Sequence, residues 1–352
     1  TIQNSAFTRV ASDSSITESS NATLEIGTGV VNIGKSAFGY MTRLKFINFK
    51  ATACNDNVSS DGIFKKVGSE LSGVTVTIAN NVTKIPANMF YAANTNITKL
   101  VFSNGSVCTD IRELAFKDTK ITSIDLPDSV VTIGANAFSD CSDATRIVIG
   151  SAVKTVGLGA FYTKTPAVTE VYYNASFNNW FGITFSGSSS NLSANPMHSH
   201  YGSLSTAPTF YSRNDDGEYT CTDASGDITD YRYEIVTEVT MPSTYTKIGD
   251  IQFVNFTQLT KIYISDTTTS IGKAAFKYCS NLEIAIMNTT VTSIGENAFA
   301  DSGIKKIYYK GTKTQKGNIT FGTNGDPGEG VWIYQIGELT YTYDSTLKTY
   351  SL

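Results

Sequence analysis

The phrase Ile-Gly-x-x-Ala-Phe recurs along the chain, and this repetition constrains the fold more than any other feature of the sequence. Clear copies end at Phe38, Phe138, Phe276 and Phe299, and looser copies end at Phe7, Phe90, Phe116, Phe161 and Phe253. Most neighbouring copies are separated by 22, 23 or 26 residues. A nearly constant period of this length is the sequence signature of a repeat protein, in which similar units stack against one another.

Two longer gaps separate copies of the phrase. The gap between Phe38 and Phe90 divides into equal halves at Phe64, where Gly-Ile-Phe forms a weak copy. The gap between Phe161 and Phe253 is 92 residues, or four periods of 23. It therefore holds either three degenerate repeats or a replacement of similar size.

A second phrase, apolar–x–x–apolar–x–apolar, precedes most copies at a constant distance. Residues 121–126 end seven positions before Ile133, and residues 259–264 end seven positions before Ile271. Their β-branched residues and alternation predict a strand, and the Ala-Phe phrase predicts a short helical turn. A strand and one turn cannot bury their apolar side alone. Each unit must therefore stack on its neighbours in a solenoid.

This pattern resembles the BspA-like, Treponema-type leucine-rich repeats, whose consensus continues the phrase with x-x-Cys-x-x-Leu. The match is close from Ile271 through Phe276 and Cys279 to Leu282. The resemblance implies a leucine-rich-repeat solenoid with a horseshoe-like form, and we expect it to be right-handed. It also implies a secreted or cell-surface bacterial protein that functions in adhesion or in binding host or matrix proteins.

The repeats divide the chain into four predicted parts: leucine-rich repeat block 1 (1–186), an irregular insertion packed on the array (187–232), leucine-rich repeat block 2 (233–330) and a C-terminal β cap (331–352). Residues 171–185 and 307–321 align at a constant offset of 136, so the same closing element ends both blocks. The insertion is rich in Ser, Gly, Asn and Asp. A flexible linker is the alternative interpretation of that segment.

Composition excludes several kinds of partner. A net charge of −4 over 352 residues provides no basic surface for nucleic acid, and no apolar run reaches the roughly 18 residues that a membrane-spanning helix needs. The chain opens at Thr1, so we expect that a signal peptide was removed or is not included.

The five cysteines form no CxxC pair. Their odd number excludes complete internal pairing, so we predict mostly reduced, buried thiols in a monomer.

No group of residues in the sequence predicts catalysis. His198 and His200 are the only histidines, and no convincing carboxylate set accompanies them as metal ligands. Cys141 and Cys279 share one repeat position, which is typical of small buried residues rather than nucleophiles. The acidic run 215–218 lacks the calcium-loop pattern. We therefore predict a protein that is not an enzyme and that has no cofactor and no metal.

The predicted strands define one surface on which residue positions can be assigned. Their x residues point away from the core, onto what we expect to be a concave sheet. Candidate partner-binding residues on this surface are Arg146, Glu170, Tyr172, Glu238, Lys261, Tyr263, Lys306 and Tyr308. Tyr and Arg are enriched at binding hot spots, although strand propensity alone also explains such residues.

Two functions fit this surface. The first is an adhesion or binding module that recognises a host or matrix protein, or a surface glycan, through the repeat surface. The second is a structural spacer that displays another domain and has no ligand of its own.

Overall fold

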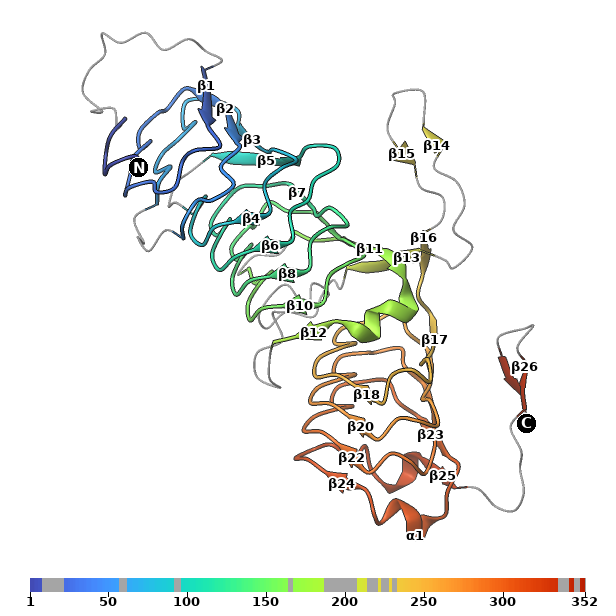
Figure 1. Ribbon diagram of the computed structural model, residues 1–352. Helices are drawn as coiled ribbons and strands as arrows, with labels where there is room; N and C mark the ends of the chain where they lie inside the picture. The colour runs from blue at the N-terminus through green and yellow to red at the C-terminus, as the bar shows by residue number, and fades with distance from the viewer. Residues whose placement is uncertain are drawn as a thin grey trace.

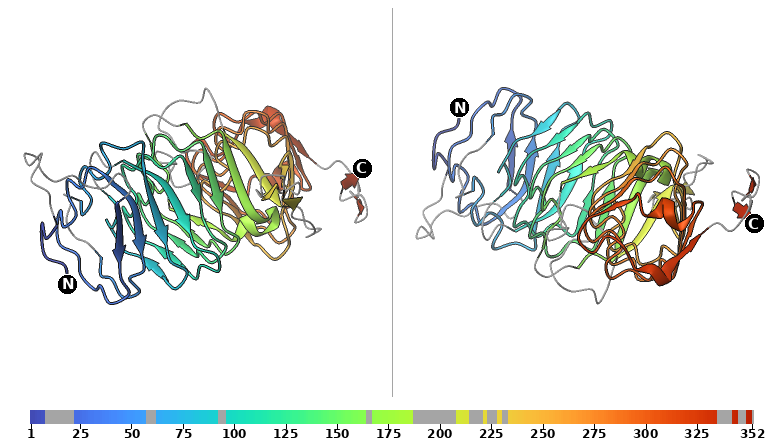
Figure 2. Two further views of the ribbon diagram at one scale, coloured as in Figure 1. Left: turned by 90° about the horizontal axis from the view of Figure 1, so that it is seen from above. Right: turned by 90° about the horizontal axis from the view of Figure 1, so that it is seen from below.

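The structure is a computed structural model. It describes residues 1–7, 22–56, 62–91, 96–163, 167–186, 208–213, 221–222, 228–229, 233–334, 342–344 and 349–351. The predicted solenoid of leucine-rich repeats is confirmed over these residues. Figures 1 and 2 show an elongated stack of turns with the N-terminus at one end and the second block at the other.

One side of the stack carries the longer strands, which follow one another in chain order and form three separate hydrogen-bonded sheets. In the first block these strands are β1 (Ala22–Ile26), β2 (Leu44–Phe49), β3 (Val74–Ile78), β5 (Ile97–Phe102), β7 (Ser123–Asp125), β9 (Arg146–Ile149), β11 (Glu170–Ser176) and β13 (Thr209–Arg213). Their pairing is parallel, and β16 (Tyr233–Ile235) then joins β13 in the antiparallel sense. The second block continues with β17 (Glu238–Thr240), β19 (Lys261–Tyr263), β21 (Ile284–Met287), β23 (Lys306–Tyr309) and β25 (Trp332–Tyr334).

A second side carries two-residue strands, most of which contain the Ile or Val that opens a repeat phrase. They are β4 (Lys84–Ile85), β6 (Asp110–Ile111), β8 (Thr132–Ile133), β10 (Thr155–Val156) and β12 (Thr184–Phe185), followed by β18 (Lys247–Ile248), β20 (Ser270–Ile271), β22 (Ser293–Ile294) and β24 (Thr320–Phe321). The remaining elements are the 3-10 helices η1 (Phe177–Gly182) and η3 (Glu329–Val331), the helix α1 (Lys313–Lys316), and two strand pairs, β14 (Cys221–Thr222) with β15 (Ile228–Thr229) and β26 (Thr342–Asp344) with β27 (Thr349–Ser351).

The helical turn predicted at each Ala-Phe phrase is wrong, because the phrase folds into consecutive turns. The residue before the Ala takes a left-handed conformation, with φ of 52° at Asn136 and 54° at Asn297. A second left-handed residue follows two positions after the Phe, as at Asp140 with φ of 57°. Two left-handed residues within one repeat interrupt a right-handed helix.

The Gly of the repeat phrase has a different role from these left-handed positions. A Cβ atom on Gly134 would lie 2.5 Å from the backbone nitrogen of Glu113 in the preceding turn, and one on Gly272 would lie 2.5 Å from that of Asp250. The Gly therefore allows the backbones of successive turns to approach closely.

The phenylalanines of the repeats stack through the core as a ladder. Ring centroids lie 5.0 Å apart between Phe90 and Phe116 and 5.2 Å apart between Phe116 and Phe138, with nearly parallel planes. Phe64 stacks between Phe38 and Phe90 in this ladder and has no exposed surface, so the weak copy of the phrase is a genuine repeat. In the second block, Phe276 stacks on its neighbours in the same way. Neighbouring turns thus bury one another's aromatic rings.

The two blocks meet at an aromatic joint around η1. Trp180 Nε1 donates a hydrogen bond of 2.9 Å to the carbonyl of Gln252, and Gln252 Nε2 donates one of 2.6 Å to the carbonyl of Trp180. Phe177 packs against Phe253 and Phe256 of the second block. Figure 1 shows the axis of the stack changing direction at this joint, with the short strands β12 and β18 along the inner side of the angle.

The predicted domain boundaries remain a prediction, but two segments bear on them. Strand β13 lies inside the proposed insertion 187–232 and extends the sheet beside β11. Strand β25 lies inside the proposed cap 331–352 and extends the sheet beside β23. His198, His200 and the acidic run 215–218 lie outside the described residues.

Candidate binding surface

The outward side chains of the long strands form a surface that we call the sheet face. In the first block, one register row crosses five strands from Asp125 through Val148, Tyr172 and Tyr211 to Ile235. Strand pairing sets these side chains beside one another, because residues on one face of neighbouring strands stand in line. The row therefore changes from an acidic end to an aliphatic end. Ile235 is 47% exposed.

Tyr172 is held between two neighbours at the centre of this row. Its ring stacks on Tyr211 with centroids 4.8 Å apart, and the Arg146 guanidinium carbon lies 4.8 Å from its centroid. Arg146 also pairs with Asp125 at 3.6 Å. Partial burial, followed by the negative charge of Glu170, raises the pKa of the Tyr172 hydroxyl. That hydroxyl is therefore a neutral hydrogen-bonding group at physiological pH.

The corresponding row of the second block runs from Thr240 through Tyr263, Ile286 and Tyr308 to Ile333. The predicted exposure of Tyr263 is wrong. Its side chain is only 3% exposed, and Lys261 Nζ lies 4.6 Å from its ring centroid. Bulky neighbours in a register row shield one another, so alternation in a strand does not by itself guarantee access to solvent.

The other predicted residues lie on the sheet face with different degrees of exposure. Arg146, Glu238 and Lys306 are exposed, whereas Glu170, Tyr172, Lys261 and Tyr308 are half-buried. The structure brings Arg146, Glu170 and Tyr172 together on β9 and β11, and it places the remaining candidates on β17, β19 and β23. Sequence reasoning missed Tyr211, Ile235 and Ile333. The alternation in Thr209–Arg213 was the available signal for Tyr211, but no repeat phrase marks that strand.

The sheet face lies on the outer side of the angle between the blocks in Figure 1, so the expected concave position does not hold for it. The inner side carries a groove of about 700 Å³ that we call the joint groove. Residues from β12 of the first block and from β18, β20, β22 and β24 of the second block line it. The short strands of both blocks therefore form this groove.

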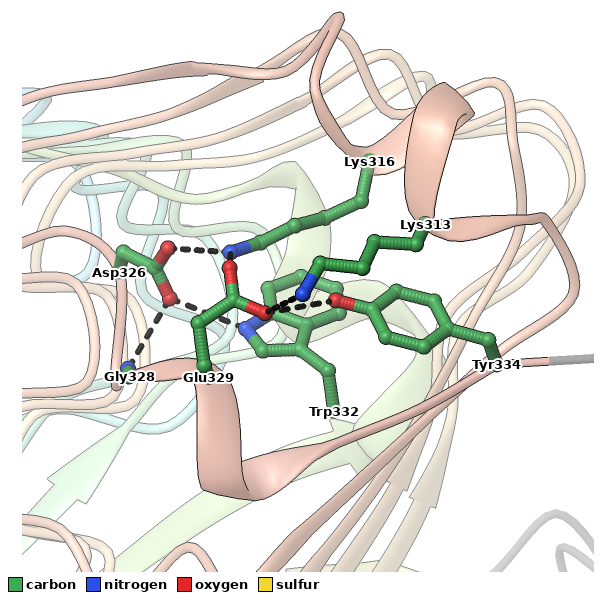
Figure 3. Close-up of polar contacts among 7 residues, drawn as sticks. All are labelled: Lys313, Lys316, Asp326, Gly328, Glu329, Trp332 and Tyr334. Atoms are coloured by element: carbon green, nitrogen blue, oxygen red, sulfur yellow. Dashed lines mark hydrogen bonds and ion pairs between the residues drawn. The ribbon is translucent and has the colours of Figure 1, made fainter.

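A network of charged residues closes the C-terminal end of the second block (Figure 3). Lys316, whose side chain is 7% exposed, contacts Asp326 at 2.6 Å and Glu329 at 2.9 Å. Its Nζ atom lies 5.1 Å from the centroid of Trp332, and the Trp332 indole donates to Asp326 at 3.0 Å. Burial opposes the charge of Lys316, yet its hydrogen bonds to both carboxylates raise its pKa. We call this network the terminal latch.

Nothing in the described part of the chain forms a metal site, since no group of three or more His, Cys, Asp or Glu side chains could hold an ion there. Cys54, Cys108, Cys141 and Cys279 are free and buried, as predicted. Cys221 lies among side chains that the structure does not describe. Within the described residues, no helix has the length and apolar character to cross a membrane.

These features define a leucine-rich-repeat solenoid with an aromatic and charged sheet face. The family model for the BspA type leucine-rich repeat region matches residues 1–93, 63–192 and 226–325. The chain therefore belongs to the BspA-type leucine-rich-repeat family, and the resemblance inferred from the repeat phrase is confirmed. A search of curated protein sequences finds no significant match.

Several solved structures resemble this fold. A leucine-rich cell surface protein of Faecalibacterium prausnitzii is 18% identical, with 88% of this chain and 83% of that chain covered and a TM-score of 0.37. The pneumococcal vaccine antigen PcpA is 14% identical, with 92% and 81% covered and a TM-score of 0.43. A leucine-rich repeat protein of Bacteroides ovatus is 16% identical, with 86% and 71% covered and a TM-score of 0.43. At such identities the likeness concerns the fold alone.

Proposed function

We propose that this chain is a non-enzymatic binding module displayed at a bacterial cell surface, and that its sheet face recognises a protein partner. The observation that carries the proposal is the row Val148, Tyr172, Tyr211 and Ile235, which spans four neighbouring strands. Arg146 lies beside this row, over the Tyr172 ring. Tyr and Arg anchors surrounded by aliphatic contacts are the composition found at protein-binding hot spots. Membership of the BspA-type family supports the surface location.

The geometry of Tyr172 favours a protein partner over a glycan at this surface. Sugars bind aromatic residues by laying their apolar face on an open ring. Both faces of the Tyr172 ring are occupied, one by Arg146 and the other by Tyr211. What Tyr172 presents is its edge and its hydroxyl, which suit hydrogen bonding and side-chain packing by a protein.

The purified chain used as bait on extracellular-matrix and mucosal extracts tests this proposal. A protein retained by the wild-type chain should be lost from the double variant Tyr172→Ser/Tyr211→Ser. With the retained protein purified, the double variant should bind more weakly by about 2 kcal/mol or more, since it removes two central anchors. Titration calorimetry measures this difference.

The matched control is Tyr162→Ser, which removes a half-buried tyrosine from the turn after Phe161 and not from the sheet face. It should bind as the wild type does, and circular dichroism should show that all variants stay folded. If folded variants bind unchanged, the sheet face is not the site. If no protein is retained at all, the structural spacer becomes the better proposal.

A further inference from the structure

The joint groove is a well-formed pocket that plays no part in the protein binding proposed above. It combines residues of both blocks, with Thr184 from β12 on one side and the register row Lys247, Ser270, Ser293 and Thr320 on the other. Its volume of about 700 Å³ lies within the range of ordinary ligand sites, which form preferentially where domains meet.

The row of first residues in the short strands gives this groove a regular polar wall. Adjacent parallel strands lie about 4.8 Å apart, so the hydroxyls of Ser270, Ser293 and Thr320 repeat at that interval along β20, β22 and β24. Each hydroxyl both donates and accepts hydrogen bonds, as sugar hydroxyls do. The interval is close to the length of one sugar unit in an extended chain. A linear oligosaccharide therefore matches the wall unit by unit.

The charges that line the groove narrow the class of ligand. Two cations, Lys247 and Lys273, are matched by two acids, Asp250 and Glu296. Because the signs balance, these side chains carry no net charge to attract a polyanion or a polycation. The four charged groups can instead bond to neutral hydroxyls, for which charge-assisted hydrogen bonds are strong.

The joint itself keeps the groove in shape. Gln252, which is 1% exposed, lines the groove and bonds to the carbonyls of Trp180 and Ile183 and to the amide of Gly249. These bonds tie the end of the first block to the start of the second. A ligand site that depends on both blocks is therefore held open before binding, which lowers the entropic cost of association.

From this geometry we propose that the joint groove binds a segment of a neutral, linear oligosaccharide. This site is separate from the sheet face and goes beyond the protein recognition proposed above. The row of hydroxyls aligns the sugar units, and the paired charges bond to hydroxyls at the rim.

A panel of neutral β-1,4-linked gluco-, manno- and xylo-oligosaccharides of increasing length tests the proposal by calorimetry and by NMR. At least one series should bind saturably to the wild-type chain, with affinity rising with length until the groove is full. The double variant Ser270→Trp/Ser293→Trp fills the groove and should lower this affinity by about tenfold or more. The milder Ser270→Ala/Ser293→Ala removes only hydroxyls and should weaken binding in the same direction.

The matched control is Thr132→Trp/Thr155→Trp, which adds the same bulk at the equivalent row of the first block, outside the groove. It should bind sugars as the wild type does. No saturable binding by any series, or unchanged binding by folded groove variants, would overturn the proposal. Tyr172→Ser/Tyr211→Ser should keep its sugar affinity, so failure of the groove and failure of the sheet face are distinguishable.

Discussion

Phe116 shows how one residue holds neighbouring turns together. Its side chain has no exposed surface, and it stacks between Phe90 and Phe138 in the aromatic ladder. Changing Phe116 to Ala removes contacts to two turns and leaves a cavity, so we expect a loss of about 3–5 kcal/mol in the free energy of unfolding. Urea denaturation followed by circular dichroism measures the loss.

Phe7 is the matched control, because it stacks on Phe38 at the end of the ladder but is 60% exposed. Phe7→Ala should cost far less than Phe116→Ala, since most of its surface already lies in water. Equal costs would show that the ladder does not carry the stability assigned to it.

The buried thiols have a measurable consequence for pH. Burial raises the pKa of Cys141 to about 12 and that of Cys108 to about 11. Native protein at pH 8 should therefore react slowly with Ellman's reagent at the four buried cysteines, and denaturant should release them. Because the unfolded thiols ionise first, near pH 9, these groups favour folding below that pH. Their contribution should be lost as pH rises toward the folded values.

Single residues also show which features of the sheet face could be predicted from the sequence and which could not. The strand register was correct, because apolar periodicity distinguishes inward from outward positions. The burial of Tyr263 could not be predicted, since it depends on which side chains from neighbouring strands stand beside it. The left-handed turn at Asn136 was missed for a related reason. The Ala-Phe pattern also suits a helix, and the pattern does not reveal the backbone angle of the residue before it.

The duplicated closing element shows one sequence pattern adapted to two roles. Its first copy includes η1, where Phe177, Trp180 and Phe181 pack on the second block. At the constant offset of 136, the second copy places Lys313, Lys316 and Gly317 at these three positions. The first copy is therefore an aromatic joint, and the second is a polar end. The duplication was readable from the sequence, but the joint was not, since Trp180 and Gln252 are far apart in the chain.

Replacing Gln252 by Ala tests the joint directly. Ala is a suitable replacement because most other repeats have Ala at the equivalent position. Gln252→Ala removes the bonds to the carbonyls of Trp180 and Ile183 and to the amide of Gly249. The Trp180 carbonyl keeps the bond from the Ile183 amide, but the other two groups lose a partner, and each unsatisfied group costs about 1–3 kcal/mol. We expect thermal unfolding monitored by calorimetry to separate into two transitions, one for each block.

The control for this variant is Trp180→Phe, which removes the indole hydrogen bond but keeps an aromatic ring in the joint. It should destabilise the joint less than Gln252→Ala. A single unchanged transition for Gln252→Ala would show that the blocks are coupled by other contacts.

The terminal latch should loosen in acid. Partial burial raises the pKa of Asp326, but the hydrogen bonds from Lys316, Gly328 and Trp332 outweigh it and hold that pKa below its usual value. A lowered carboxyl pKa stabilises the fold above the unfolded value of about 4, and that contribution is lost as pH falls further. In a Trp180→Phe background, Trp332 is the only remaining tryptophan. Its fluorescence should therefore change as the pH falls below about 4.

Lys316→Met should alter the Trp332 fluorescence at neutral pH and shift its acid transition to higher pH, because Asp326 loses the strongest group that lowers its pKa. The control is Lys305→Met, which breaks the exposed ion pair between Lys305 and Glu283. Surface pairs contribute little, so this variant should keep the wild-type acid transition. An identical acid response in Lys316→Met would assign the transition to other groups.

At the scale of the whole molecule, the joint determines the shape. Two stacks meet at an angle, and the hydrogen bonds between Trp180 and Gln252 fix the start of the second stack on the end of the first. The period of the repeat predicted an elongated stack, because each unit contacts only its neighbours. The direction of the bend could not be predicted from the period, since it arises from aromatic residues outside the repeat phrase.

Small-angle X-ray scattering tests this shape. A compact globule of 352 residues would have a radius of gyration of about 20 Å, and the solenoid should exceed that value clearly. Gln252→Ala should keep both blocks folded, because their aromatic ladders do not pass through the joint side chain. It should broaden the distribution of intramolecular distances, since the angle between the stacks is no longer fixed. A radius near that of a globule would contradict the elongated stack. If Gln252→Ala shows two unfolding transitions but an unchanged distance distribution, contacts other than those of Gln252 fix the angle between the stacks. The packing of Phe177 on Phe253 and Phe256 is then the remaining contact to remove.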